Sequence, residues 1–152
     1  MTARYWDDYT LGETFETEPV EVTEAAIIAF AEKYDPQVIH TDPVGAKDSF
    51  YGGLIASGHQ TIGLAFAQFV RLGLFNEHGL GGPGMDEVRW SAPVRPGDTL
   101  HTTSEVVELR ASKSRPDRGI IRVCLRTKVD DREVSSYITT TFLRRRPSEE
   151  SA

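Results

Sequence analysis

Two side chains that could move protons lie close together in the stretch KYDPQVIHTDP, residues 33–43. Asp35 and His40 are five residues apart, and Pro36 and Pro43 flank them. A carboxylate and an imidazole that reach one water molecule can take a proton from it and deliver one elsewhere. Spacing alone leaves open a second interpretation, in which the acid ends a helix and the histidine has no role.

A second stretch, FYGGLIASGHQT at residues 50–61, favours the chemical interpretation. The Gly52-Gly53 pair allows a ligand or another backbone to approach closely, and Ser57-Gly58 opens the next helix. The first turn of a helix carries unpaired N–H groups and a partial positive charge. A glycine there would let a ligand oxygen reach the amide of Gly58 directly, as in an oxyanion hole. Ser57 also fits an ordinary N-cap, and both roles can coexist.

Two helices must position these groups. Thr23 is a plausible N-cap for a helix over residues 24–34, which ends there because Pro36 disfavours helical geometry at Asp35. Residues 58–75 predict a second helix that is apolar on nearly every side, and such a helix is expected to be buried all round.

The second half of the chain predicts strands. Residues 119–129 alternate strictly between apolar and polar side chains, and residues 133–144 alternate again through Val134, Ile138 and Phe142. One sheet can cover an apolar helix on all sides only by wrapping it. We therefore expect an α+β chain with one hotdog domain over residues 1–146, a curved antiparallel sheet around a long central helix, and a disordered tail over 147–152. The remaining strands are expected at 13–21, 85–92 and 99–110.

Composition excludes several classes of function. The 152 residues carry a formal net charge of −6, so the basic excess of a nucleic-acid-binding protein is missing. The single cysteine, Cys124, excludes an internal disulfide framework and a multi-cysteine metal site. No apolar run predicts a signal peptide or a membrane span, so we expect a cytoplasmic protein without membrane contacts. Asp35, His40 and Asp42 could be interpreted as metal ligands, but no fourth ligand is apparent and we expect no metal.

These blocks resemble a known family. Asp-x-x-x-x-His-x-Asp-Pro, from Asp35 to Pro43, followed by Phe-x-Gly-Gly-Leu-Ile-Ala-Ser-Gly over 50–58, is similar to the MaoC-like dehydratases, the hotdog-fold (R)-specific enoyl-CoA hydratases. Segments 88–100 and 114–123 also resemble members. Many members have Asn and Pro where this chain has Gln37 and Val38. Some carry a serine near the position of Phe66, which cannot donate a hydrogen bond.

The resemblance implies reversible addition of water to a trans-2-enoyl-CoA, giving an (R)-3-hydroxyacyl-CoA. Asp35 and His40 would hold and activate the water, and the Gly58 amide would polarise the thioester carbonyl. Coenzyme A is part of the substrate, so no separate cofactor is expected. The other expected substrate contacts are Gly53, Ser57 and His59.

Residues 110–118 form a basic run. Arg115 and Arg118 would contact the phosphates of coenzyme A, although the run also fits a solvated hairpin.

Two hotdog subunits commonly pair their sheets edge to edge, and an open strand edge is usually covered. We therefore expect a homodimer or a larger assembly built from dimers.

Two other functions stay open. Hotdog acyl-CoA thioesterases often place a carboxylate on or beside the central helix, and residues 58–75 contain only Gln60 and Gln68 in place of an acid. A non-catalytic subunit that binds acyl thioesters is the second alternative.

Overall fold

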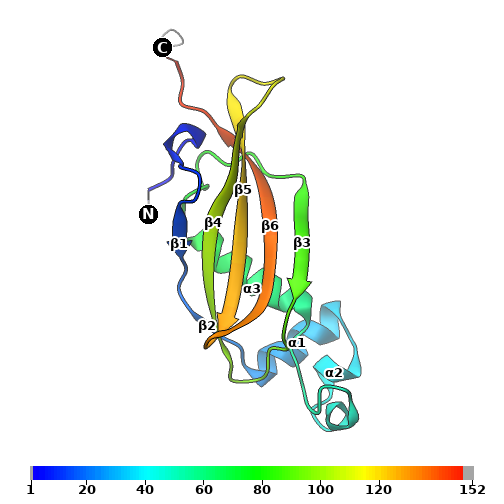
Figure 1. Cartoon of the computed structure of the whole chain (residues 1–152). Coiled ribbons are helices and arrows are strands. Elements are labelled where there is room, and N and C mark those ends of the chain that lie inside the picture. The colour runs from blue at the N-terminus through cyan, green and yellow to red at the C-terminus, as the bar shows by residue number, and fades with distance from the viewer. Residues whose placement is uncertain (1, 149–152) are drawn as a thin grey trace.

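The computed structural model describes residues 2–148, which form one antiparallel six-stranded sheet with helices beside it (Figure 1). The strand order is β1-β4-β5-β6-β3, and β2 pairs with one end of β4. The expected hotdog domain of the α+β class is confirmed. The strands are β1 Thr14–Glu16, β2 Val20–Glu21, β3 Gly84–Trp90, β4 Thr99–Ala111, β5 Arg118–Val129 and β6 Arg132–Arg144.

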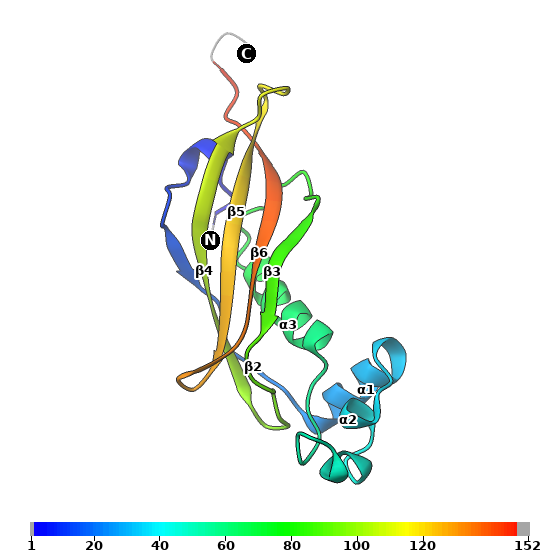
Figure 2. The same cartoon turned by 45° about the vertical axis from the view of Figure 1, so that its right-hand side comes forward.

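The helices lie on one side of the sheet and beyond one of its ends. The long helix α3, Gly58–Arg71, crosses one face, while α1 and α2 lie beyond the end at which β2 pairs (Figure 2). No helix among residues 2–148 is long and apolar enough to cross a membrane. Of the expected tail, residues 147–148 are in no helix or strand, and residues 149–152 lie outside the described part. The shorter helices are η1 Trp6–Asp8, α1 Glu24–Tyr34, α2 Val38–Thr41 and η2 Gly45–Asp48.

The prediction that the central helix is buried all round is wrong for a single chain. The sheet covers only one side of α3, and Val70 on the helix is 46% exposed. The helix is also shorter than expected, because Gly73 adopts a left-handed φ of 79° and turns the chain. Leu74 then folds back into the core under the sheet.

The alternation of β5 is confirmed, and that of β6 is shifted by a bulge. Ile121, Val123, Leu125, Thr127 and Val129 of β5 are all buried. Thr127 of β5 pairs with Ser135 of β6, but the next residue of β5, Lys128, pairs with Glu133. Val134 of β6 is therefore an extra residue without a partner in β5. The residues after it therefore change sides. Ile138 pairs with Cys124 on the other face of the sheet, and Tyr137 and Leu143 enter the core in place of Ile138 and Phe142.

The buried apolar side chains form two separate clusters. The first, which we call the sheet core, lies between the sheet and the second half of α3. The second, the site core, lies under α1 at the end of the sheet and supports the loop that carries Asp35 and His40. The sheet core comprises Tyr9, Phe69, Leu74, Val106, Ile121, Val123, Leu125, Tyr137 and Leu143, and the site core Val22, Ile27, Ala46, Leu54, Ala56, Val94, Leu100, Val129 and Val134.

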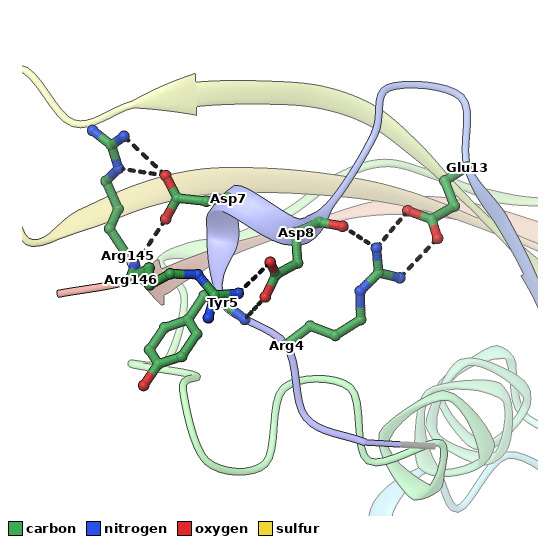
Figure 3. Close-up of polar contacts among 7 residues, drawn as sticks. All are labelled: Arg4, Tyr5, Asp7, Asp8, Glu13, Arg145 and Arg146. Carbon is green, nitrogen blue, oxygen red and sulfur yellow. Dashed lines mark hydrogen bonds and ion pairs between the residues drawn. The ribbon is translucent and has the colours of Figure 1, made fainter. Parts of the chain in front are cut away.

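A cluster of charged groups joins η1, near the start of the chain, to the residues that follow β6 (Figure 3). The guanidinium of Arg145 donates to Asp7 Oδ1 at 2.9 and 3.1 Å, and the backbone N–H of Arg146 donates to Asp7 Oδ2 at 2.8 Å. The side chain of Arg146 reaches Asp8 at 2.5 Å. Burial raises the pKa of Asp7, but the N–H of Arg146 and the guanidinium of Arg145 together outweigh it and hold that pKa below its ordinary value.

Asp7→Asn is expected to lower the melting temperature at pH 7 by roughly 1–4 °C, since a partly exposed ion pair contributes about 0.2–1 kcal/mol. A carboxylate with a lowered pKa stabilises the fold above its unfolded value of 3.8 and loses that effect as pH falls through the folded value. The difference from wild type should therefore shrink as pH falls below 3.8. Circular dichroism melts at pH 7 and at a series of pH values below 3.8 measure it. Asp117→Asn is the control, because the partner of Asp117 is its sequence neighbour Arg118. Equal melting points for wild type and Asp7→Asn would contradict the role of Asp7.

Candidate active site

Asp35 and His40 meet because the chain turns between two helices. Helix α1 begins at Thr23, whose hydroxyl accepts the N–H of Ala26 at 3.1 Å, and it ends with Asp35 in a non-helical conformation. Pro36 prevents the helix from continuing. The single turn α2 then presents His40 toward Asp35, with 3.3 Å between His40 Nε2 and Asp35 Oδ2.

The hydrogen bonds of His40 locate its protons. Its Nδ1 lies 2.8 Å from the carbonyl oxygen of Ile55. Because a carbonyl can only accept, Nδ1 must carry a hydrogen. The other ring nitrogen, Nε2, faces a carboxyl group, and a favourable contact there requires one further proton between the two groups. The pair, formed by the buried His40 and the partly exposed Asp35, is therefore arranged to hold and exchange a proton.

Asp35 is held as a carboxylate. Its Oδ1 accepts from the side-chain amide of Gln37 at 2.8 Å, and its Oδ2 accepts from the hydroxyl of Ser57 at 2.7 Å. The Gln37 hydrogen bond lowers the pKa of Asp35 most, burial opposes it, and Ser57, His40 and His59 lower it further. The net result is a pKa below the ordinary value.

Gln37→Met is expected to raise the pKa of Asp35 toward its ordinary value of 3.8, because the variant keeps the length of the side chain and removes the donor. The lowered pKa stabilises the folded protein above pH 3.8, and that effect is lost as pH falls through the folded value. The variant should lose it at a higher pH than wild type. A carbon-13 NMR titration of the Asp35 carboxyl measures the shift directly. Gln68→Met, on α3 outside the cavity wall, is the matched control. A titration curve identical to wild type would rule out this role for Gln37.

Ser57 and Gly58 open α3 as expected, but they have different roles. The fully buried hydroxyl of Ser57 accepts the N–H of His59 at 3.3 Å and donates to Asp35. Ser57 is absent from the cavity wall, and its two hydrogen bonds tie the start of the helix to the carboxylate. The backbone N–H of Gly58, by contrast, makes no hydrogen bond within residues 2–148, and Gly58 lies on the cavity wall.

A cavity of about 560 Å³ joins these groups. Asp35, His40, Gly58 and His59 all line it, so four of the expected site residues share one space. The apolar side chains of its wall come from the helical segment, from the connection between β3 and β4, and from β6. That wall includes Ile39, Ile55, Ala92, Val94 and Val134.

Besides Ser57, three expected substrate contacts are not in this wall. Gly53 lies beside Arg95, with 3.5 Å between a Cβ built at Gly53 and Arg95 Nη1. Arg115 and Arg118 lie in the β4–β5 hairpin at the opposite end of the sheet (Figure 1). Arg118 pairs across the sheet with Arg144, whereas the cavity lies at the Val134 end of β6. Their expected contact with a ligand in this cavity therefore does not form within one chain.

The structure adds two residues that sequence reasoning missed. Trp90, at the end of β3, lines the cavity beside Gly58. The guanidinium of Arg95 donates from Nη2 to the carbonyl of Tyr51, a residue of the cavity wall, at 2.6 Å, and it forms no ion pair with a carboxylate within residues 2–148. Both lie in the segment 88–100, which resembles members of the family but in which the sequence assigned no residue a role. Nothing in their spacing indicated that they approach Gly58 or Tyr51.

The chain is similar to known proteins over most of its length. Residues 8–128 match the family model described as the MaoC like domain. The chain belongs to the MaoC-like dehydratase family. Over 121 residues it is 32% identical to an uncharacterized protein, YdeM, from Bacillus subtilis, covering 80% of this chain and 84% of the relative.

Solved structures of this MaoC-like fold superpose closely. A MaoC-like dehydratase from Rhodospirillum rubrum has 35% identity and a TM-score of 0.88, with 96% of this chain and 100% of that chain covered. An (R)-hydratase from A. caviae shares the fold at 20% identity and a TM-score of 0.67, covering 92% of this chain and 98% of that one. Family membership supports a hydratase or dehydratase. Among residues 2–148, no group of three or more His, Cys, Asp or Glu side chains could hold a metal.

Proposed function

We propose that this MaoC-like protein reversibly adds water to the double bond of a trans-2-enoyl-CoA and forms an (R)-3-hydroxyacyl-CoA. One observation carries the proposal. The Asp35–His40 pair and the unpaired N–H of Gly58 face the same cavity of about 560 Å³. Hydration of a conjugated thioester needs both, since one group must handle the protons of water and another must stabilise the enolate.

The protons balance with these two side chains alone. A water between Asp35 and His40 attacks C3 as its proton passes to the Asp35 carboxylate. The enolate oxygen accepts the N–H of Gly58, and C2 then takes the proton from Nε2 of His40. The proton on Asp35 returns to His40 across the 3.3 Å contact, which restores the starting state. Because this cycle is closed, we propose that no separate cofactor takes part.

The surroundings of the cavity support a coenzyme A thioester as the substrate class. Ile39, Ile55 and Val94 provide apolar walls suited to an acyl chain. The guanidinium of Arg95 lies beside the wall without a carboxylate partner among the described residues, in a chain whose net charge is −6. It replaces Arg115 and Arg118 as the proposed contact for phosphate groups within one chain.

Crotonyl-CoA separates this function from its alternatives. Loss of the enoyl absorbance without release of free thiol supports the hydratase. Release of thiol identifies a thioesterase, and binding without turnover identifies a non-catalytic subunit. Helix α3 carries no Asp or Glu that could act as the base of a thioesterase.

We also propose that two copies pair through β3. This edge strand is almost entirely exposed, with Met85 at 41%, and an open edge is a ready surface for a second strand. Light scattering is expected to give twice the chain mass of 16.9 kDa, or a larger even multiple. Met85→Asp should weaken the dimer, whereas the same change at the exposed Leu11, which lies outside β3, should leave it intact. A wild-type monomer at micromolar concentration would exclude this assembly.

A further inference from the structure

The indole of Trp90 covers the first residue of α3. A Cβ built at Gly58 would lie 2.2 Å from Trp90 Cε2 and 2.3 Å from Trp90 Nε1. Such distances mean that the ring rests directly against the backbone of Gly58. Trp90 also lines the cavity, although it is 52% exposed.

The backbone of β3 fixes this position. Its pairing with β6 shifts between Asp86 and Arg89, and Glu87 has a left-handed φ of 53°. This bulge sets the direction of the last residues of the strand. After it, Trp90 pairs with Ser135, and its ring meets the ring of His59 edge-on at 5.9 Å.

The indole N–H of Trp90 has no acceptor among residues 2–148. An indole nitrogen can only donate, and a buried tryptophan usually satisfies it. The chain's other tryptophan does so, because Trp6 Nε1 donates to the carbonyl of Ile120 at 3.0 Å. Within residues 2–148, Trp90 Nε1 donates to nothing, and neither does the backbone N–H of the adjacent Gly58. Two free donors therefore lie next to each other in one cavity wall.

We propose that Trp90 is a catalytic residue whose indole N–H donates, together with the N–H of Gly58, to the thioester carbonyl oxygen. This inference rests on the proposed hydration. The oxygen gains negative charge as the enolate forms, and it has lone pairs for two donors. Donors fixed beforehand at the place where charge develops stabilise the transition state more than the ground state.

Trp90→Phe tests the donor, because it keeps an aromatic ring against Gly58 and removes the N–H. We expect kcat for crotonyl-CoA to fall by about 10²-fold, near the lower end for the loss of one oxyanion donor, with little change in KM. Trp6→Phe is the matched control, since Trp6 lies away from the cavity, and its turnover should equal that of wild type.

A second measurement reports on the carbonyl itself. Butyryl-CoA labelled with carbon-13 at its carbonyl cannot be hydrated, so its infrared stretch can be recorded in the bound state. Wild type should lower this frequency relative to free butyryl-CoA, and Trp90→Phe should lower it less. If Trp90→Phe folds poorly, 3-benzothienylalanine at position 90 in the Trp6→Phe background keeps the shape of indole without its N–H.

The outcomes separate this inference from the proposed function. A wild-type protein that neither hydrates crotonyl-CoA nor shifts the butyryl carbonyl overturns both. A wild-type protein that does both, with Trp90→Phe or the benzothienyl variant equal to it in kcat and in carbonyl frequency, overturns only the role of Trp90. Loss of turnover together with a smaller carbonyl shift supports it.

Discussion

Asp35→Asn is expected to lower kcat for crotonyl-CoA hydration by roughly 10²–10⁴-fold, the usual scale for acid–base catalysis, in a protein that remains folded. Asparagine has nearly the same shape and can still accept from Ser57 or Gln37. It cannot accept a proton from water, and it removes the negative charge next to His40. Initial rates at saturating substrate, with circular dichroism to confirm folding, measure the effect.

His40→Ala should cost a similar factor, and the double variant should be little worse than either single one, because groups that act as a unit are not additive. Asp42→Asn is the control. Asp42 lies in the same loop outside the cavity wall, and its Oδ1 accepts the N–H of Val44 at 3.0 Å, which asparagine can also do. A folded Asp35→Asn protein with near-wild-type turnover would remove Asp35 from the mechanism.

Gly58→Ala is expected to reduce kcat by about 10²-fold or more, the cost of losing an oxyanion donor, while the melting point changes little. The new methyl group would occupy the position of the Trp90 indole, so the ring must move into the space where a thioester would approach. The half-exposed ring can move without disturbing either core. Gly58→Val should act in the same way and more strongly.

Gly63→Ala is the matched control on the same helix. A Cβ at Gly63 meets nothing within 4 Å, so turnover should hold, and the helix should gain up to about 1 kcal/mol. Gly58→Pro adds the same Cβ as Gly58→Ala and also removes the N–H, since proline suits the first position of a helix but has no donor, so kcat of Gly58→Pro relative to Gly58→Ala isolates the donor. Normal turnover by Gly58→Pro would show that the Gly58 amide is not the oxyanion donor.

Local signals in the sequence predicted the elements and the centre of the site. Period-two alternation indicated β5, and Thr23 and Pro36 bounded α1. The same signals placed Asp35 and His40 in one loop between helices. These features depend on residues close together in the chain, where side-chain type and backbone preference act directly.

Features that depend on distant residues were not predictable. The bulge at Val134 follows from how β6 pairs with β5, and no residue in β6 marks it. Arg115 looked suitable for a phosphate by charge alone, but the topology of the sheet carries its hairpin to the far end. The contact between Trp90 and Gly58 joins the end of β3 to the start of α3. Only the three-dimensional arrangement brings them together.

The separation of the two cores means that activity and global folding can be lost at different concentrations of denaturant. Asp35 and His40 lie on a segment supported by the site core, and the bond from Ala56 N–H to Val94 O, at 2.8 Å, joins this segment to the connection between β3 and β4. Units with separate cores open with separate free energies. Turnover should therefore disappear in urea while the amide hydrogens of β4, β5 and β6 are still protected from exchange. The circular dichroism control for Asp35→Asn and His40→Ala is therefore complete only together with amide exchange of the segment from Asp35 to Gly58, which reports local opening.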